Sequence, residues 1–149
     1  MKWNTIIEII VLLFATLFLY TGISKLMEYA VFKEQIALSP LLKPVSRWLA
    51  IILPITEIIV SVILFIPITR LKGLYASLLL MVLFTGYIVY ILIYNDHLPC
   101  TCGGVLESLS WKQHLLFNSI CIVLALTGIV LCRRIHTNLR EKSTSMASS

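Results

Sequence analysis

The chain has 149 residues, of which 59% are hydrophobic and 13% are charged, and its mean hydropathy is +0.96. A soluble domain typically has about 25% charged residues, so this composition excludes a water-soluble globular protein and indicates one embedded in a membrane. The net charge of +5 comes from lysines and arginines that flank the apolar segments, and it gives no reason to predict nucleic-acid binding.

Four apolar segments are each long enough to cross a bilayer as a helix, which takes roughly 20 residues. The first follows Lys2 and has no small-x-small cleavage site, so we predict a membrane helix and not a cleaved signal sequence. The predicted fold is all-α, a four-helix transmembrane bundle forming one domain over residues 1–134, with a basic, serine-rich and disordered tail over residues 135–149. The predicted spans are residues 5–22, 48–66, 74–94 and 111–131.

The longest link, residues 23–47, is amphipathic and ends at Pro40 and Pro44. Such a segment predicts a short helix that lies along the membrane surface between the first two spans. Its apolar residues are Leu26, Tyr29, Ala30, Phe32 and Ile36, and its charged residues are Lys25, Glu28, Lys33 and Glu34.

Four spans place both termini on the same side of the membrane. Basic residues are more frequent on the cytoplasmic side, so their distribution predicts the orientation. Of the twelve lysines and arginines, seven share the side of the termini: Lys2, Arg70, Lys72, Arg133, Arg134, Arg140 and Lys142. The other five are Lys25, Lys33, Lys43, Arg47 and Lys112. This excess predicts cytoplasmic termini and an extracytoplasmic segment between the third and fourth spans.

That segment contains Cys100 and Cys102, preceded by Pro99 and followed by two glycines. Disulfides form and persist outside the cytoplasm. A Cys-x-Cys disulfide closes a very small ring and is usually strained, and strained disulfides exchange readily. The glycines also leave the backbone open to a partner. The pattern therefore predicts thiol–disulfide exchange.

Two other interpretations of the cysteines remain open. The pair could form a purely structural disulfide that staples the segment. Together with His97 it could also offer soft ligands to copper(I), although a closed zinc site requires four ligands. Only His97 lies close in sequence to the two cysteines and the segment contains no methionine, so the metal signal is weak and we name no metal ligand.

Polar side chains also lie within the predicted spans. At about 100° per residue, His114, Asn118, Cys121 and Cys132 fall on one side of the fourth helix. Lipid offers no hydrogen-bond partner, so this side should face the bundle interior. Glu57 lies at a similar depth in the second span, and we expect it to face His114 and Asn118. An ionisable residue inside a membrane is a functional candidate, although these groups could serve only to fasten helices together.

Tyr87, Tyr90 and Tyr94 recur with i, i+3, i+7 spacing near the outer end of the third span. This spacing is more typical of an interfacial aromatic belt than of a quinone pocket. We therefore predict no cofactor from the sequence.

Several short motifs together resemble the MauE branch of the DoxX-like membrane proteins, over most of the chain up to about Arg134. They are Phe18-Leu-Tyr-Thr-Gly-Ile-Ser-Lys-Leu26, Pro54-Ile-Thr-Glu57, Cys100-Thr-Cys-Gly-Gly104, Trp111-Lys-Gln-His114 and Asn118. The resemblance implies a four-helix bundle of the bacterial inner membrane that helps the disulfide-rich small subunit of methylamine dehydrogenase to mature. It also implies a thioredoxin-like or other extracytoplasmic redox partner.

Carried over to this chain, the resemblance makes Cys100 and Cys102 the redox pair. The polar framework would be Lys25, Glu57, His114 and Asn118. The predicted function is therefore that of a thiol-disulfide oxidoreductase component of the membrane. One alternative is a non-catalytic subunit whose outer loop docks a partner and is stapled by a structural disulfide, and another is a small-molecule or metal-handling protein built around Glu57. The chain lacks the Cys-x-x-Cys and the second cysteine pair that quinone-coupled thiol oxidases generally present.

Overall fold

The structure, a computed structural model, describes residues 2–94 and 111–147, and within them it contains helices and no strand. The predicted all-α fold is therefore confirmed. Two single-turn 3-10 helices precede the second and third membrane helices, η1 (Lys43–Val45) and η2 (Pro67–Thr69). The α-helices are α1 (Lys2–Met27), α2 (Tyr29–Leu38), α3 (Ser46–Phe65), α4 (Arg70–Tyr94) and α5 (Trp111–Ala147).

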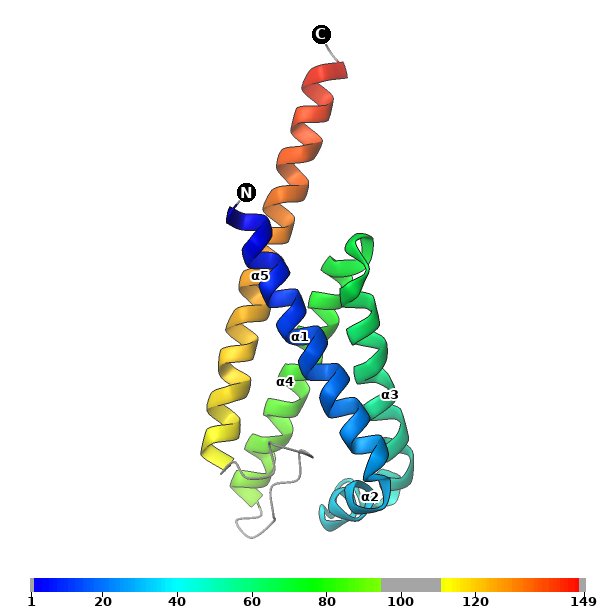
Figure 1. Cartoon of the computed structure of the whole chain (residues 1–149). Helices are drawn as coiled ribbons and strands as arrows, with labels where there is room; N and C mark the ends of the chain where they lie inside the picture. Colours follow the sequence, from blue (N-terminus) through cyan, green and yellow to red (C-terminus); the bar gives the residue numbers. More distant parts are fainter. Residues whose placement is uncertain (1, 95–110, 148–149) are drawn as a thin grey trace.

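Four of these helices are long and apolar enough to cross a membrane, which confirms the predicted number of spans. Figure 1 shows both termini at one end of the bundle, with α2 lying across the opposite end. The end of α4 and the start of α5 lie at the α2 end as well. The membrane-crossing stretches are Asn4–Met27, Lys43–Phe65, Pro67–Tyr90 and Gln113–Asn138.

The first membrane helix is longer than predicted, since α1 continues to Met27 and not to residue 22. Lys25 therefore belongs to a membrane helix and not to the link that follows it. Gly22 and Ser24, which weaken a helix only modestly, do not end α1. The short amphipathic helix predicted between the first two spans is present as α2, whose buried residues are Phe32 and Ile36.

The predicted disorder of the C-terminal tail is wrong, because α5 runs without interruption to Ala147. Residues 133–142 include arginines, a leucine, a glutamate and a lysine, which are strong helix formers, and no glycine or proline follows Gly128. A membrane helix also supplies the costly helical nucleus, so that elongation adds one hydrogen bond for each further residue.

The bundle consists of two closely packed helix pairs, α1 with α3 and α4 with α5, while α2 packs on α3. Their shared core fills the half of the bundle nearer the termini. Figure 1 shows α4 and α5 diverging from α1 and α3 toward the α2 end. Fully buried members of the core are Phe14, Ala15, Leu64, Leu74 and Ala125.

Small residues bring α1 and α3 into close contact. Ser61 of α3 donates a hydrogen bond of 2.7 Å to the carbonyl oxygen of Ala15 in α1. A Cβ atom placed on Gly22 would lie 2.9 Å from Ile58 Cγ1 and 3.0 Å from the carbonyl oxygen of Pro54. Small side chains that let helix backbones approach are typical of membrane helix interfaces. Gly22 therefore sets the separation of α1 and α3 beside the polar residues described below.

We expect Gly22→Ala to lower the free energy of unfolding by about 1–3 kcal/mol, because the new methyl group forces the α1 and α3 backbones apart. Gly86→Ala is the matched control, since a Cβ atom there meets nothing within 4 Å. It should be neutral or stabilising by up to about 1 kcal/mol, the helix-propensity difference between the two residues. Denaturant titration of the purified protein, followed by circular dichroism, measures both. Equal effects of the two substitutions would contradict the close approach at Gly22.

Candidate functional site

A buried ion pair joins α1 to α3. Glu57 is fully buried and Lys25 is only 6% exposed. The Lys25 Nζ atom lies 2.5 Å from Glu57 Oε1 and donates a hydrogen bond to it. The Thr21 hydroxyl lies 3.3 Å from Glu57 Oε2 and 2.9 Å from the carbonyl oxygen of Leu17, and its single proton can be donated to either. The carboxylate is thus enclosed by polar groups from α1.

The helical spacing of α1 explains this arrangement. Thr21 and Lys25 are four residues apart, which places both side chains on one face of a helix. Because α1 stays helical to Met27, that face reaches Glu57 in α3. A lone carboxylate among lipid tails costs a few kcal/mol or more, whereas the pair is neutral overall. The aliphatic part of Lys25 is buried with it.

Two aromatic rings complete the surroundings of the ammonium group. Lys25 Nζ lies 5.2 Å from the ring centroid of Phe84 in α4 and 5.5 Å from that of Phe32 in α2. Cations within about 6 Å of a ring face are attracted by its quadrupole, more strongly where water is excluded. Lys25 therefore contacts side chains from three other helices, although it was predicted only as a charged residue of the link and a member of the polar framework.

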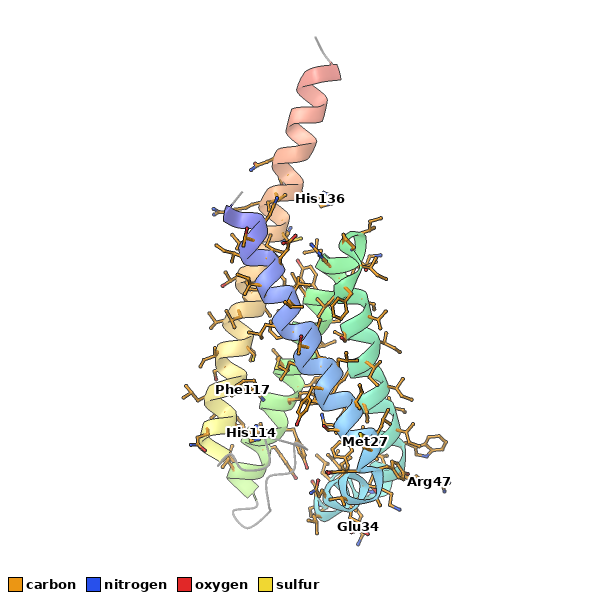
Figure 2. The ribbon with its side chains drawn as sticks, in the orientation of Figure 1. Met27, Glu34, Arg47, His114, Phe117 and His136 are labelled. Atoms are coloured by element: carbon orange, nitrogen blue, oxygen red, sulfur yellow. The ribbon has the colours of Figure 1, made fainter. Side chains whose placement is uncertain are left out.

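A cavity of about 390 Å³ adjoins the ion pair. Residues from all five helices line it, and most of them are apolar. Figure 2 shows His114 and Phe117, two of its lining residues, on α5 toward the end of the bundle opposite the termini. Its polar lining residues include Thr21, Lys25, Glu57, His114 and Asn118, and its aromatic ones Phe18, Phe32, Phe84, Tyr87 and Phe117.

His114 and Asn118 are one helical turn apart on α5, and both are buried. The structure places them in the bundle interior, together with Cys121. Glu57 therefore lines the same cavity as His114 and Asn118, which it was expected to face, but the hydrogen-bond partners of its carboxylate are Lys25 and Thr21 of α1.

Thr21 was not predicted as a site residue. Its i, i+4 spacing to Lys25 was the available signal, since the two form one polar face at the end of an otherwise apolar helix. Phe84 carried no sequence signal, because one phenylalanine in an apolar span is indistinguishable from a lipid-facing residue.

Cys100, Cys102 and His97 lie outside the described residues. They come between Tyr94, at the end of α4, and Trp111, at the start of α5, and these two helix ends lie at the α2 end of the bundle. The two cysteines within the described residues, Cys121 and Cys132, are free thiols. No three His, Cys, Asp or Glu side chains in residues 2–94 and 111–147 form a group that could hold a metal ion.

We expect Glu57→Gln to lower the free energy of unfolding by about 3–5 kcal/mol, because it leaves the Lys25 charge buried without a counter-charge. Replacing both partners, as Lys25→Met with Glu57→Leu, should recover most of that loss, since neither charge then remains. Denaturant titration of the unmodified protein and the two variants measures both changes.

Glu8→Gln is the matched control, because Glu8 is largely exposed and lies 3.9 Å from Arg70. It should change the free energy of unfolding by less than about 1 kcal/mol. A double variant no more stable than Glu57→Gln would show that the pair is not the unit that matters.

Comparison with known proteins agrees with the motifs and the fold. A protein-family model described as "Methylamine utilisation protein MauE" matches residues 3–131. No curated protein and no solved structure gives a significant match. The matched region covers α1 to α4 and most of the membrane-crossing part of α5, and it includes every residue of the predicted site. The chain belongs to the MauE family of membrane proteins.

Proposed function

We propose that this protein exchanges disulfide bonds between the Cys100–Cys102 pair and a partner protein outside the membrane. One observation carries the proposal. Five buried polar residues, from α1, α3 and α5, line a single cavity in a bundle whose α4 and α5 are joined by the cysteine segment. Polar residues are expensive within a membrane and are usually functional there. The cavity lies toward the end of the bundle at which α4 ends and α5 begins, on either side of the cysteine segment. This position favours a role of the polar residues in the reaction of the cysteines.

In the proposed reaction, the thiolate of one cysteine attacks a sulfur of the partner's disulfide. A mixed disulfide forms and one partner thiolate leaves. The second cysteine then attacks the mixed disulfide, so that this chain gains a disulfide and the partner becomes a dithiol. Two electrons move from this chain to the partner, and the reverse sequence donates a disulfide instead.

The family points to the biological setting of this exchange. MauE proteins are named for methylamine utilisation. Within that setting we propose that the chain passes disulfide equivalents during maturation of the disulfide-rich small subunit of methylamine dehydrogenase. A thioredoxin-like protein is the proposed immediate partner. The protein would lie in the bacterial inner membrane with both termini in the cytoplasm.

The polar framework would act by positioning. The Lys25–Glu57 pair fixes the end of α1 against α3, and His114 lies three residues after the start of α5. Because Lys25 Nζ also lies over the Phe84 ring of α4, the framework would help to hold α4 and α5, the two helices that flank the cysteines, in one place. None of the framework residues needs to contact sulfur in this proposal.

We expect a membrane-impermeant maleimide to label the protein in intact, reduced cells, because Cys100 and Cys102 lie outside in the proposed topology. The double variant Cys100→Ser, Cys102→Ser should lose this labelling. Its remaining cysteines lie within the membrane-crossing part of α5, and Cys121 is fully buried. Labelling that appears only after lysis would reverse the proposed orientation.

We expect one of the single variants, Cys100→Ser or Cys102→Ser, to accumulate a mixed disulfide with its partner in the native host. The remaining thiol can attack but the product cannot be resolved. Non-reducing electrophoresis detects the adduct, and mass spectrometry identifies the partner.

Two controls accompany this experiment. The double variant should form no adduct, and Cys132→Ser should behave as the unmodified protein, because Cys132 lies in α5 far along the chain from the pair. If neither single variant forms a cysteine-dependent adduct, the pair is a structural staple and the protein is a docking subunit.

A further inference from the structure

The cavity beside the ion pair has the size and lining of a ligand site. Its volume of about 390 Å³ falls within the range of about 300–1,000 Å³ that is usual for small-molecule sites. Such sites are mostly apolar, with a few converging polar groups that orient the ligand. The lining of this cavity follows that pattern, since its few polar residues stand among leucines, isoleucines and aromatic rings.

The charges in the lining favour a neutral ligand. Lys25 and Glu57 satisfy each other, so an added anion would compete with Glu57 and an added cation would compete with Lys25. The Lys25 ammonium group still offers hydrogen bonds to a neutral molecule, because it carries three N–H donors and Glu57 accepts one of them.

The polar groups come from separate helices. Lys25, Thr21 and Glu57 belong to α1 and α3, whereas His114 and Asn118 belong to α5. Histidine and asparagine side chains can each donate and accept a hydrogen bond. A ligand between these helices can therefore be bonded at two of its edges, whether those edges carry acceptors or donors.

The aromatic residues favour a flat ring. Phe18, Phe84 and Tyr87 line the cavity on α1 and α4, and offset or edge-to-face contacts with a planar ligand each add to the gain from apolar burial. A phospholipid acyl chain would fill the apolar space but would make no hydrogen bond to the polar groups that also line the cavity.

We propose that this cavity binds a lipid-soluble quinone. A para-quinone is neutral and flat, and it has a carbonyl oxygen at each of two opposite edges. Its reduced form carries hydroxyl groups at the same places, which histidine and asparagine can also bond. The inference concerns binding only and does not depend on the thiol exchange proposed above.

Duroquinone tests the proposal, with durene as the matched control. Durene has the same flat six-membered carbon skeleton with the same four methyl groups, but its ring is aromatic and it lacks both oxygens. We expect duroquinone to raise the melting temperature of the purified full-length protein in detergent in a saturable way. Durene should bind at least about tenfold more weakly, the effect of losing one or two hydrogen bonds. Equal binding of the two compounds would overturn the proposal.

Two pairs of variants place the ligand in the cavity. Leu53→Trp fills it and should abolish the shift, whereas Ile52→Trp, at the neighbouring and 54% exposed position, should leave it unchanged. Asn118→Leu should weaken duroquinone binding about tenfold, and Ser119→Leu, on the exposed side of α5, should not. Melting temperatures without ligand show whether each variant is folded. If Leu53→Trp is not folded, the comparison of Asn118→Leu with Ser119→Leu tests the proposal.

Two further results would overturn the inference. The rise in melting temperature could be as large in Leu53→Trp and Asn118→Leu as in the unmodified protein, in which case duroquinone only partitions into the micelle. Alternatively, native mass spectrometry could show a bound phospholipid that duroquinone does not displace, in which case the cavity is a lipid site. Neither result bears on thiol exchange, since the experiment measures ligand binding and not the reaction of any cysteine.

Discussion

The Lys25–Glu57 ion pair is the interaction on which the interior of this bundle depends. In water an exposed ion pair of this kind contributes little to stability. Within a membrane neither charged group can be hydrated instead, so each depends on the other. The pair therefore requires α1 to remain helical up to Lys25 and α3 to pass close beside it. Gly22 permits that approach, and Phe84 and Phe32 enclose the ammonium group from α4 and α2. A single contact thus relates four of the five helices.

Hydropathy alone predicted the number and approximate position of the spans, because bilayer thickness sets a minimum helix length that few other constraints disturb. The inward orientation of His114 and Asn118 followed from helical periodicity, because lipid offers no hydrogen-bond partner to a polar side of a helix. The partner of Glu57 could not be predicted this way. Lys25 follows an apolar run and precedes an amphipathic one, so its assignment to link or helix depended on a contact 32 residues away. Local pattern contains no information about such contacts.

The C-terminal tail of α5 shows that local composition can also mislead. Polar, serine-rich composition indicated disorder, but residues attached to the end of a stable helix are in a different situation from an isolated peptide. Aromatic residues of the cavity were also beyond prediction. Phe84 and the exposed phenylalanine Phe65 are alike in sequence context, and only the packing of α4 against the other helices distinguishes them. The site as a whole is therefore a product of helix arrangement, although its polar members are visible in the sequence.

The division of the ion pair between α1 and α3 has a consequence for the biogenesis of the protein. During synthesis α1 enters the bilayer before α3 exists. Until then Lys25 can lie near the interface, where its long side chain keeps the charged end in water. Glu57 enters later, in the interior of a helix, where insertion of an isolated ionised residue is opposed by about 2.5–3.5 kcal/mol. Packing of α3 against α1 pairs Glu57 with Lys25 and so offsets this free-energy cost of insertion. The order of the helices along the chain thus makes the cation available before the carboxylate that needs it.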